Sequence, residues 1–360
     1  MIIEKNEIAE KLKQLKTIGS PKTSDKPQGV LLKDNCLKAN NLQIALTVPL
    51  SVHTDEAFVI PLSAIALIES LPAGEVEIKG TAKAVTVKSG NLKSRFPTFP
   101  VDDFTEPKPM NEELTPAFQL SFGDVADGID KIMYACPVEA AKPVLQGIYF
   151  DGNGQHLNLV ASDAKRIAIS MVSTTQKVNV VVPREAIKTL LAVGDTSTDI
   201  KFFTEDKRVI IEIGEYTIYA LLYSDSYMNY RAVFPKDPKL TLRVNKNELA
   251  GVLNRCLICQ NKELLKSQTI LKYCKGDDKM SVILFGATNG FAEVVNCNTN
   301  GDNDMRIGFN TRYLYDAVKA SNDENIVMQF YSDNTAFIVC DNTLRQLIAP
   351  VMLSDAAKKV

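Results

Sequence analysis

The sequence repeats itself with a period of about 120 residues, and this repeat limits the possible folds more than any other feature. Each copy begins with a short amphipathic helix, predicted at residues 6–15, 124–133 and 247–256. In all three helices, apolar residues fall at positions i, i+4 and i+7, the spacing of one helix face packed on a core. A period of this length is too long for a solenoid, so it indicates tandem domains.

A second unit recurs halfway through each copy, where a strand leads into a helix at residues 59–68, 181–190 and 308–317. Proline or asparagine stands where this helix begins, as a helix N-terminus favours. Runs with alternating apolar and polar residues follow each helix, which is typical of antiparallel sheet with one lightly covered face. We therefore predict an α+β fold in which each copy places two helices against antiparallel sheet.

The linkers follow the same period. Residues 105–113 and 234–239 are rich in proline and charge, as exposed and fairly stiff connections are. The predicted domains comprise residues 1–114, 115–239 and 240–353, and a short polar tail follows at 354–360. Three copies carry six helices, and a two-fold homodimer, the commonest homo-oligomer, would place twelve around a closed channel.

Composition excludes several classes of protein. The formal net charge of −2 argues against binding nucleic acid over the whole surface, although basic residues confined to one face remain possible. The sequence lacks an apolar run long enough to span a membrane, and its first residues lack the pattern of a signal peptide. Seven cysteines, an odd number at irregular spacing, fit reduced thiols better than a disulfide framework. We expect a cytoplasmic protein.

Motifs for catalysis or cofactor binding are missing from the sequence. Cys256 and Cys259 have CxxC spacing, but they lack a second ligand pair and lie inside a predicted helix, so we interpret them as two helical thiols. Nucleotide-binding loops, zinc-protease motifs and serine-hydrolase motifs are absent. We expect no enzyme activity, no cofactor and no bound metal. Two rival classes remain, an enzyme with a site between domains and a β-repeat interaction protein that does not bind nucleic acid.

Four segments resemble the beta subunit of bacterial DNA polymerase III, the sliding clamp. They are residues 143–168, 229–235, 307–314 and 347–353. Within the first, residues 161–168 match the family's run of a small residue, Ser or Thr, Asp, any residue, a basic residue, Arg, an aliphatic residue and Ala. The resemblance implies a non-catalytic processivity factor, a head-to-tail homodimeric ring that encircles duplex DNA. It also implies partners that carry a clamp-binding motif, among them the polymerase alpha subunit and the clamp loader.

The resemblance implies a peptide-binding cleft between the second and third domains. Polymerases and the clamp loader insert a short segment with Leu and Phe anchors into it. The positions that match the cleft are Leu145, Ser162, Ala164, Lys165, Arg166, Ile167, Met228, Val233, Asn310, Tyr313, Asn334, Ala336, Leu347 and Ala349. Met228 stands where proline is usual, and Asn334 and Ala349 replace larger apolar residues.

Two further surfaces follow from the resemblance. Weak attraction between helix cations and phosphates suffices for a ring held by topology. The candidate DNA contacts are Lys13, Lys16, Lys22, Lys142, Arg184, Lys188, Arg255, Arg312 and Lys319. The expected subunit seam lies between domain one and the end of a domain-three helix, at Lys93, Arg95, Phe96, Ile258 and Cys259. A divergent clamp with altered partners, for instance one carried by a mobile element, is a third alternative.

Overall fold

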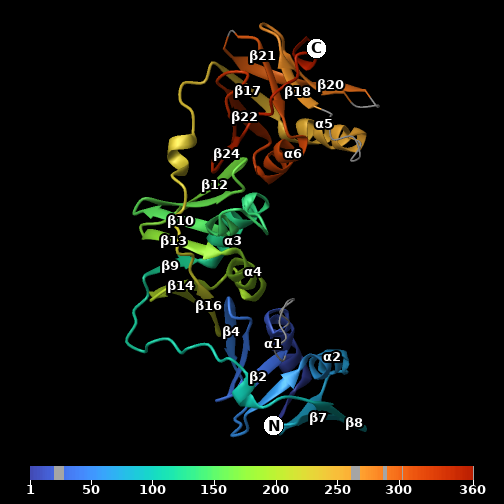
Figure 1. The fold of residues 1–360 in the computed structure, drawn as a ribbon, viewed down its shortest axis with the longest axis vertical. Coiled ribbons are helices and arrows are strands. Elements are labelled where there is room, and N and C mark those ends of the chain that lie inside the picture. Colours follow the sequence, from blue (N-terminus) through green and yellow to red (C-terminus); the bar gives the residue numbers. More distant parts are fainter. Residues whose placement is uncertain (20–27, 261–267, 287–289, 302, 360) are drawn as a thin grey trace. The chain divides into compact units, whose positions relative to one another are not determined.

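The computed structural model describes residues 1–19, 28–260, 268–286, 290–301 and 303–359. Within these residues, antiparallel pairing joins the strands into three sheets, and α-helices cover sheet faces (Figure 1). Every helix in the described ranges is too short or too polar to cross a lipid bilayer.

The predicted helices are confirmed in the described residues, with small shifts in their ends. They are α1 (Lys5–Ile18), α2 (Leu62–Ser70), α3 (Phe122–Asp130), α4 (Arg184–Val193), α5 (Lys246–Cys259) and α6 (Thr311–Ala320). The α5 and α6 helices begin at asparagine caps, because the Asn245 and Asn310 side chains each accept two backbone N–H groups of the first turn. Short 3₁₀ turns complete the helical elements: η1 (Val101–Asp103), η2 (Met133–Ala135), η3 (Pro143–Gln146), η4 (Tyr230–Val233) and η5 (Ala357–Lys359).

The α3 helix ends three residues earlier than predicted, at Asp130. The chain continues through the 3₁₀ turn η2, and Ile132 is still buried although it lies outside the α-helix. Gly128 lies inside α3, where a Cβ atom would meet the Leu159 side chain at 2.7 Å. The close approach of α3 to the strand beneath it therefore favours glycine at this position, because a larger residue would displace the Leu159 side chain.

Two of the sheets are formed by strands between residues 2 and 221. In spatial order, the four-stranded sheet comprises β1 (Ile2–Glu4), β6 (Glu75–Gly80), β7 (Ala84–Ser89) and β8 (Leu92–Pro97). The eight-stranded sheet comprises β5 (Phe58–Pro61), β2 (Gly29–Lys33), β3 (Cys36–Asn40), β4 (Ile44–Pro49), β16 (Tyr216–Leu221), β15 (Arg208–Ile213), β14 (Asp199–Glu205) and β9 (Phe118–Ser121). The pairing of β4 with β16 joins strands of the first and second sequence copies into one sheet.

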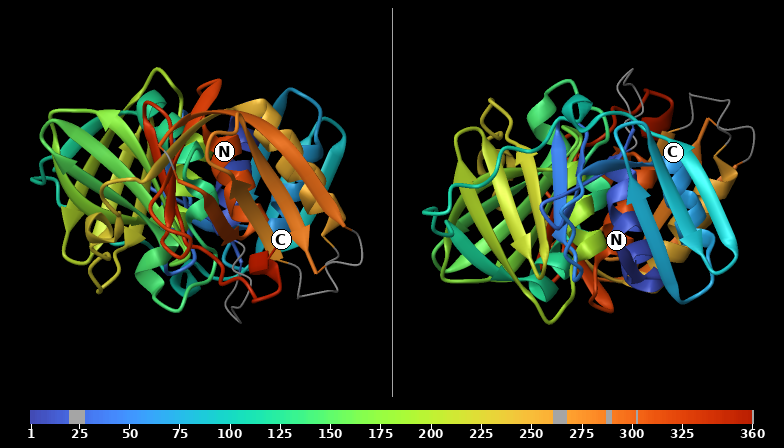
Figure 2. Two further views of the ribbon diagram at one scale, coloured as in Figure 1. Left: turned by 90° about the horizontal axis from the view of Figure 1, so that it is seen from above. Right: turned by 90° about the horizontal axis from the view of Figure 1, so that it is seen from below.

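The third sheet has twelve strands and joins the second copy to the third. In spatial order they are β13 (Lys177–Pro183), β10 (Gly147–Asn153), β11 (His156–Ser162), β12 (Arg166–Ser173), β24 (Leu344–Ile348), β23 (Phe337–Cys340), β22 (Asn325–Phe330), β17 (Leu240–Asn245), β20 (Phe291–Asn300), β19 (Lys279–Phe285), β18 (Gln268–Tyr273) and β21 (Met305–Phe309). The α5 and α6 helices pack side by side on the strands of the third copy (Figure 1 and Figure 2).

The chain forms two compact units, and the division between them passes through the second copy. Unit 1 contains residues 1–126 and 182–224, and unit 2 contains residues 127–181 and 225–360. Each unit contains one of the sheets that run from one copy to the next, which explains why the second copy is shared. The three-domain division of the sequence stays a prediction.

The C-terminal segment, predicted to be a polar tail, packs against unit 2. Ala357 is fully buried, and Arg306 donates a hydrogen bond to the carbonyl of Lys358. Gln268 accepts a hydrogen bond from the backbone N–H of Ser354 at 3.0 Å. These contacts attach the end of the chain to the β18–β21 strands.

Substitutions on the α5 helix test how the core of unit 2 is packed. Leu253 is fully buried among the apolar side chains of the third copy, whereas its neighbour Asn254 is exposed. Leu253→Ala should lower the free energy of unfolding by about 2–5 kcal/mol, because it leaves a cavity in a packed core. Asn254→Ala, the control on the same helix, should change it by less than about 0.5 kcal/mol in urea unfolding followed by circular dichroism. Equal effects would show that α5 does not pack as described.

Candidate functional site

The residues predicted to form the cleft fall into two neighbouring groups in unit 2. The first is an apolar cluster, which consists of Val160, Ile167, Tyr230 and Leu347 with the half-buried Tyr149, Ile169, Tyr227, Met228, Phe234 and Ala336. Ile167 and Leu347 are paired across the ladder of β12 and β24, so their side chains share one face of the sheet. This group contains four of the predicted cleft residues: Ile167, Met228, Ala336 and Leu347.

Aromatic residues of the linker before β17 cover this cluster. The Tyr149 ring stacks on Tyr227 with centroids 5.0 Å apart and meets Tyr230 edge-on at 6.3 Å. The Tyr230 hydroxyl donates to Asp151 at 2.6 Å, and burial together with this carboxylate raises the pKa of the phenol. Arg231 binds the same carboxylate at 2.6 Å. These polar contacts hold the linker against the sheet and leave the apolar ring faces on the cluster.

The second group surrounds Arg166. Its Nε lies 3.0 Å from Asp163 and its Nη1 lies 2.8 Å from Asp316, while Nη2 donates to the carbonyl of Tyr134 at 2.8 Å. The guanidinium also lies over the rings of Tyr134 and Tyr313, 4.8 and 4.3 Å from their centroids. Asp316 lies on α6 and Arg166 begins β12, so this network connects the second and third copies.

The turn that precedes Arg166 is fixed by its own side chains. The Ser162 hydroxyl donates to the carbonyl of Arg166 at 2.9 Å and accepts from the backbone N–H of Ala164 at 3.1 Å. Asp163 accepts from the backbone N–H groups of Lys165 and Arg166, and Ala164 has a positive φ of 68°. Ser162 is fully buried, so it shapes the turn and does not line an open surface. The guanidinium of Arg166 is similarly occupied by Asp163, Asp316 and the Tyr134 carbonyl. Arg166 is therefore a positioning residue, which holds β12 and α6 together.

The other predicted cleft residues lie around these two groups. Leu145 is buried in η3, and Val233 is exposed in η4. Asn310 caps α6 and thereby fixes the turn that carries Tyr313. The remaining predicted residues are exposed or half-buried: Ala164, Lys165, Asn334 and Ala349.

Sequence reasoning missed several residues of these groups. Tyr230 and Phe234 lie in a segment that resembles the family, but their packing on the apolar cluster has no sequence signal. Asp163 lies in the matched run three residues before Arg166, so its charge and spacing gave some indication that the two side chains pair. Asp316 gave none, because the contact with Arg166 spans 150 residues.

The candidate DNA contacts are mostly exposed helix cations, and four of them are paired with carboxylates. Lys16 binds Glu69 at 2.7 Å, and Lys188 binds Glu185 at 2.8 Å. Arg312 binds Asp316 at 3.1 Å. Arg255 binds Glu293 on β20, and this contact holds the pKa of the carboxylate below its usual range. A phosphate would have to exchange with these carboxylates, which surface ion pairs allow because each contributes about 0–1 kcal/mol.

The remaining candidate contacts differ in their surroundings. Within the described residues, Lys13, Lys142 and Lys319 are exposed and have no carboxylate partner. Arg184 is half-buried at the start of α4. Lys22 lies outside the described residues. The α3 helix carries the exposed acids Asp127 and Asp130, and Asp127 binds Lys131 at 2.7 Å, so this helix adds little positive charge.

The predicted seam residues lie on or beside strand edges. Lys93, Arg95 and Phe96 belong to β8, which is the last strand of its sheet. On unit 2, the first half of β20 pairs only with β19 in the described part of the chain. Ile258 and Val294 near that edge are 75% and 52% exposed. Open strand edges with exposed apolar side chains favour association with another chain.

The CxxC cysteines are helical thiols of ordinary character. Cys256 is buried and Cys259 is half-buried in the last turn of α5, and burial raises the pKa of Cys256 to about 11. Redox CxxC motifs instead have a lowered thiol pKa. Within the described residues, no group of three or more His, Cys, Asp or Glu side chains could hold a metal ion.

Comparison with known families assigns the C-terminal two-thirds of the chain. Residues 119–227 match the model for the central domain of the DNA polymerase III beta subunit, and residues 231–352 match the model for its C-terminal domain. The chain belongs to the DNA polymerase III beta subunit family. This confirms the resemblance seen in the sequence. The family consists of non-catalytic processivity factors, so the rival interpretation as an enzyme is not favoured.

Individual beta subunits are similar along nearly the whole chain. The beta sliding clamp of Staphylococcus epidermidis is 22% identical over 332 residues, covering 87% of this chain and 86% of that protein. A solved putative beta subunit from Eubacterium rectale superimposes with a TM-score of 0.89 at 17% identity, covering 97% and 98% of the two chains. The Bacillus subtilis sliding clamp gives 0.88 at 17% identity, covering 98% and 99%. The predicted α+β clamp fold is therefore confirmed.

The Arg166 network supplies a test of the site's architecture. Arg166→Ala should lower the free energy of unfolding of unit 2 by about 3–5 kcal/mol, because it removes the largely buried guanidinium that binds both Asp163 and Asp316. Arg312→Ala removes an exposed arginine from the same Asp316 and should cost less than about 1 kcal/mol. Urea unfolding of both variants measures the difference. A loss for Arg166→Ala no larger than for Arg312→Ala would show that the network does not hold the junction.

Proposed function

We propose that two copies of this chain close head to tail into a ring that encircles duplex DNA and holds a polymerase on it. The family match over residues 119–227 and 231–352 carries this proposal. The proteins that it resembles are named beta sliding clamps, and the fold agrees with theirs along the chain. The interpretation as a β-repeat protein without nucleic acid is not favoured, and neither is a clamp paralogue with altered partners.

The charge distribution supports enclosure as the source of the hold on DNA. The net charge is −2, and four candidate cations are engaged by carboxylates, so adhesion to phosphates would be weak. Strong fixed contacts would oppose sliding, whereas a closed ring needs only a weak, sequence-independent attraction. Exposed lysines such as Lys13 and Lys319 can supply that attraction.

We assign the seam of the ring to two strand edges. Strand β8 of one copy would pair with the open half of β20 of the other, with Ile258 covered on closure. The assignment is supported by the position of β8 as the last strand of its sheet and by the exposed apolar side chains beside the open half of β20. Burial of the exposed Ile258 and Val294 would contribute roughly 25 cal/mol per Å² of apolar surface removed from water.

We assign partner binding to the apolar cluster of unit 2. A segment with Leu and Phe anchors would bind at the half-buried Met228 and Ala336, over the apolar floor to which Ile167 and Leu347 belong. Partners of this kind include the polymerase alpha subunit, the clamp loader and other proteins with a clamp-binding motif. A protein that acts on DNA in this way belongs in the cytoplasm, and the seven cysteines, none of them in a disulfide, agree with a reducing compartment.

Retention on DNA tests the proposed function. After loading by a clamp loader, the protein should stay on nicked circular DNA and leave linear DNA through its ends, because a ring is held by topology. Gel filtration of the loaded templates measures retention. Equal loss from circular and linear DNA would contradict encirclement.

A seam variant sharpens this experiment. Ile258→Lys places a cation opposite Lys93 and Arg95 across the proposed seam, so retention on circular DNA should fall to the level seen on linear DNA. Leu42→Lys makes the same kind of change at an exposed apolar side chain away from the seam and should behave as the unaltered protein. Loss of retention in both variants would show that the effect is not specific to the seam.

A further inference from the structure

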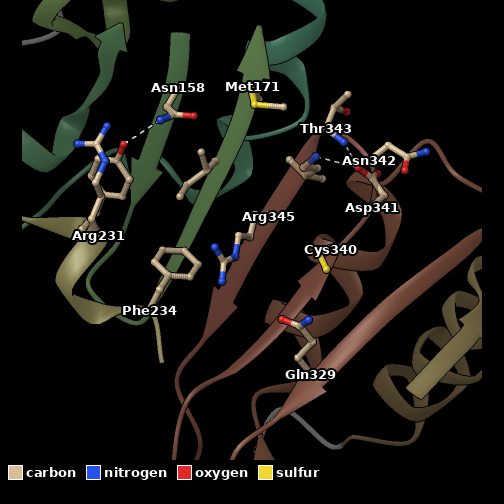
Figure 3. A pocket seen from close by; sticks show the side chains of 13 residues that line it. Asn158, Met171, Arg231, Phe234, Gln329, Cys340, Asp341, Asn342, Thr343 and Arg345 are labelled. Atoms are coloured by element: carbon tan, nitrogen blue, oxygen red, sulfur yellow. Dashed lines mark hydrogen bonds between the residues drawn. The ribbon is translucent and has the colours of Figure 1, made fainter. Parts of the chain in front are cut away.

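A pocket of about 620 Å³ opens in unit 2 beside the apolar cluster (Figure 3). Strands β11, β12 and β24 form its floor, η4 forms one wall and the turn between β23 and β24 forms the other. None of the cleft positions implied by the family resemblance lines it. We call it the flanking pocket.

The flanking pocket is continuous with the apolar cluster. Ile169, Tyr230 and Phe234 belong to both. On the sheet, Ile169 pairs with Arg345 in the same ladder that pairs Ile167 with Leu347 two residues away. Side chains two residues apart on a strand point to the same face. A chain that occupies the cluster therefore needs only a few more residues to reach the flanking pocket.

Arg345 gives this pocket its chemical character. Its guanidinium lies 4.8 Å from the centroid of the Phe234 ring, and its side chain is exposed. Its polar contacts in the described residues include a hydrogen bond with Tyr331 but no ion pair with a carboxylate. An arginine that is held by an aromatic face and is not neutralised is arranged to bind an anionic group.

The other charged groups at the pocket are already engaged. Asp341 accepts the backbone N–H groups of Thr343 and Leu344 at 2.9 and 2.8 Å with one oxygen, and that of Asn322 at 3.2 Å with the other. Arg231 is paired with Asp151 at 2.6 Å. Among the charged residues that line the pocket, Arg345 is therefore the one available to bind a ligand.

We propose that the flanking pocket binds the residues that flank the apolar anchors of a clamp-binding segment, and that Arg345 selects an acidic side chain among them. Met171, which is 46% exposed, and Phe234 offer apolar surface to the rest of that flank. The inference rests on the proposed function of the apolar cluster and extends it. The occupant is the partner's own chain, because the pocket and the cluster share residues and the charge in the pocket is positive.

Peptide binding measured by fluorescence anisotropy tests this inference. A core peptide with Leu and Phe anchors is compared with peptides extended at either end by four residues containing two Glu or two Lys. At one of the two ends, the Glu extension should tighten binding to the unaltered protein by about threefold to tenfold, as one partly exposed charged contact allows. The gain should shrink as salt is raised.

Charge reversal identifies the residue responsible. Arg345→Glu should leave affinity for the core peptide unchanged, abolish the gain from Glu and make the Lys extension the tighter one. Arg243→Glu alters an exposed arginine on β17 of the same sheet, outside the pocket, and should keep the preference for Glu. Unchanged binding of the core peptide by Arg345→Glu also shows that the variant is folded.

The outcomes separate this inference from the function on which it rests. Failure of the core peptide to bind the unaltered protein would overturn both the cluster assignment and the flanking pocket. Binding of the core peptide with no gain from Glu at either end would overturn the flanking pocket alone. A Glu preference that survives Arg345→Glu would overturn the role of Arg345.

Discussion

The antiparallel pairing of β12 with β24 is the interaction on which the candidate site depends. It joins residues 166–170 to residues 344–348 by backbone hydrogen bonds and so makes one sheet from strands of two sequence copies. Because register on a sheet fixes which side chains share a face, this ladder alone brings Ile167 beside Leu347 and Ile169 beside Arg345. A shift of one residue would turn these side chains to the opposite face, and both the apolar cluster and the flanking pocket would be lost.

The same kind of junction occurs in unit 1, where β4 pairs with β16. The sheet that continues from one copy to the next gives each unit an extended framework on which helices pack. At the junction in unit 2, the Arg166 network adds a second connection between β12 and α6. Residues that the family resemblance places in a binding cleft therefore also hold the framework together. This dual role explains why Ser162 and Arg166 are buried or engaged and not free at a rim.

Much of the fold could be predicted from the sequence, because helix periodicity and alternating strands are local patterns. The helices beginning near Asn6 and Asn247 illustrate this. The early end of α3 could not be predicted, since its apolar spacing continues to Ile132 while the backbone changes to a 3₁₀ turn. Contacts between copies were also beyond local reasoning: Asp316 reaches the site through its contact from α6 with Arg166, and Arg345 through the register of β24 with β12. The pairing of Arg255 with Glu293 joins residues 38 positions apart on a helix and a strand, so no sequence signal indicated that this cation is paired.

If enclosure holds this protein on DNA, its own assembly must contain a hole. Electron microscopy of the isolated protein, with class averages of the dimer, tests this most directly. We predict closed rings made of two copies, with a central opening wide enough for a double helix. Dimers without an opening would contradict the account. So would a protein that remains a single copy as its concentration is raised.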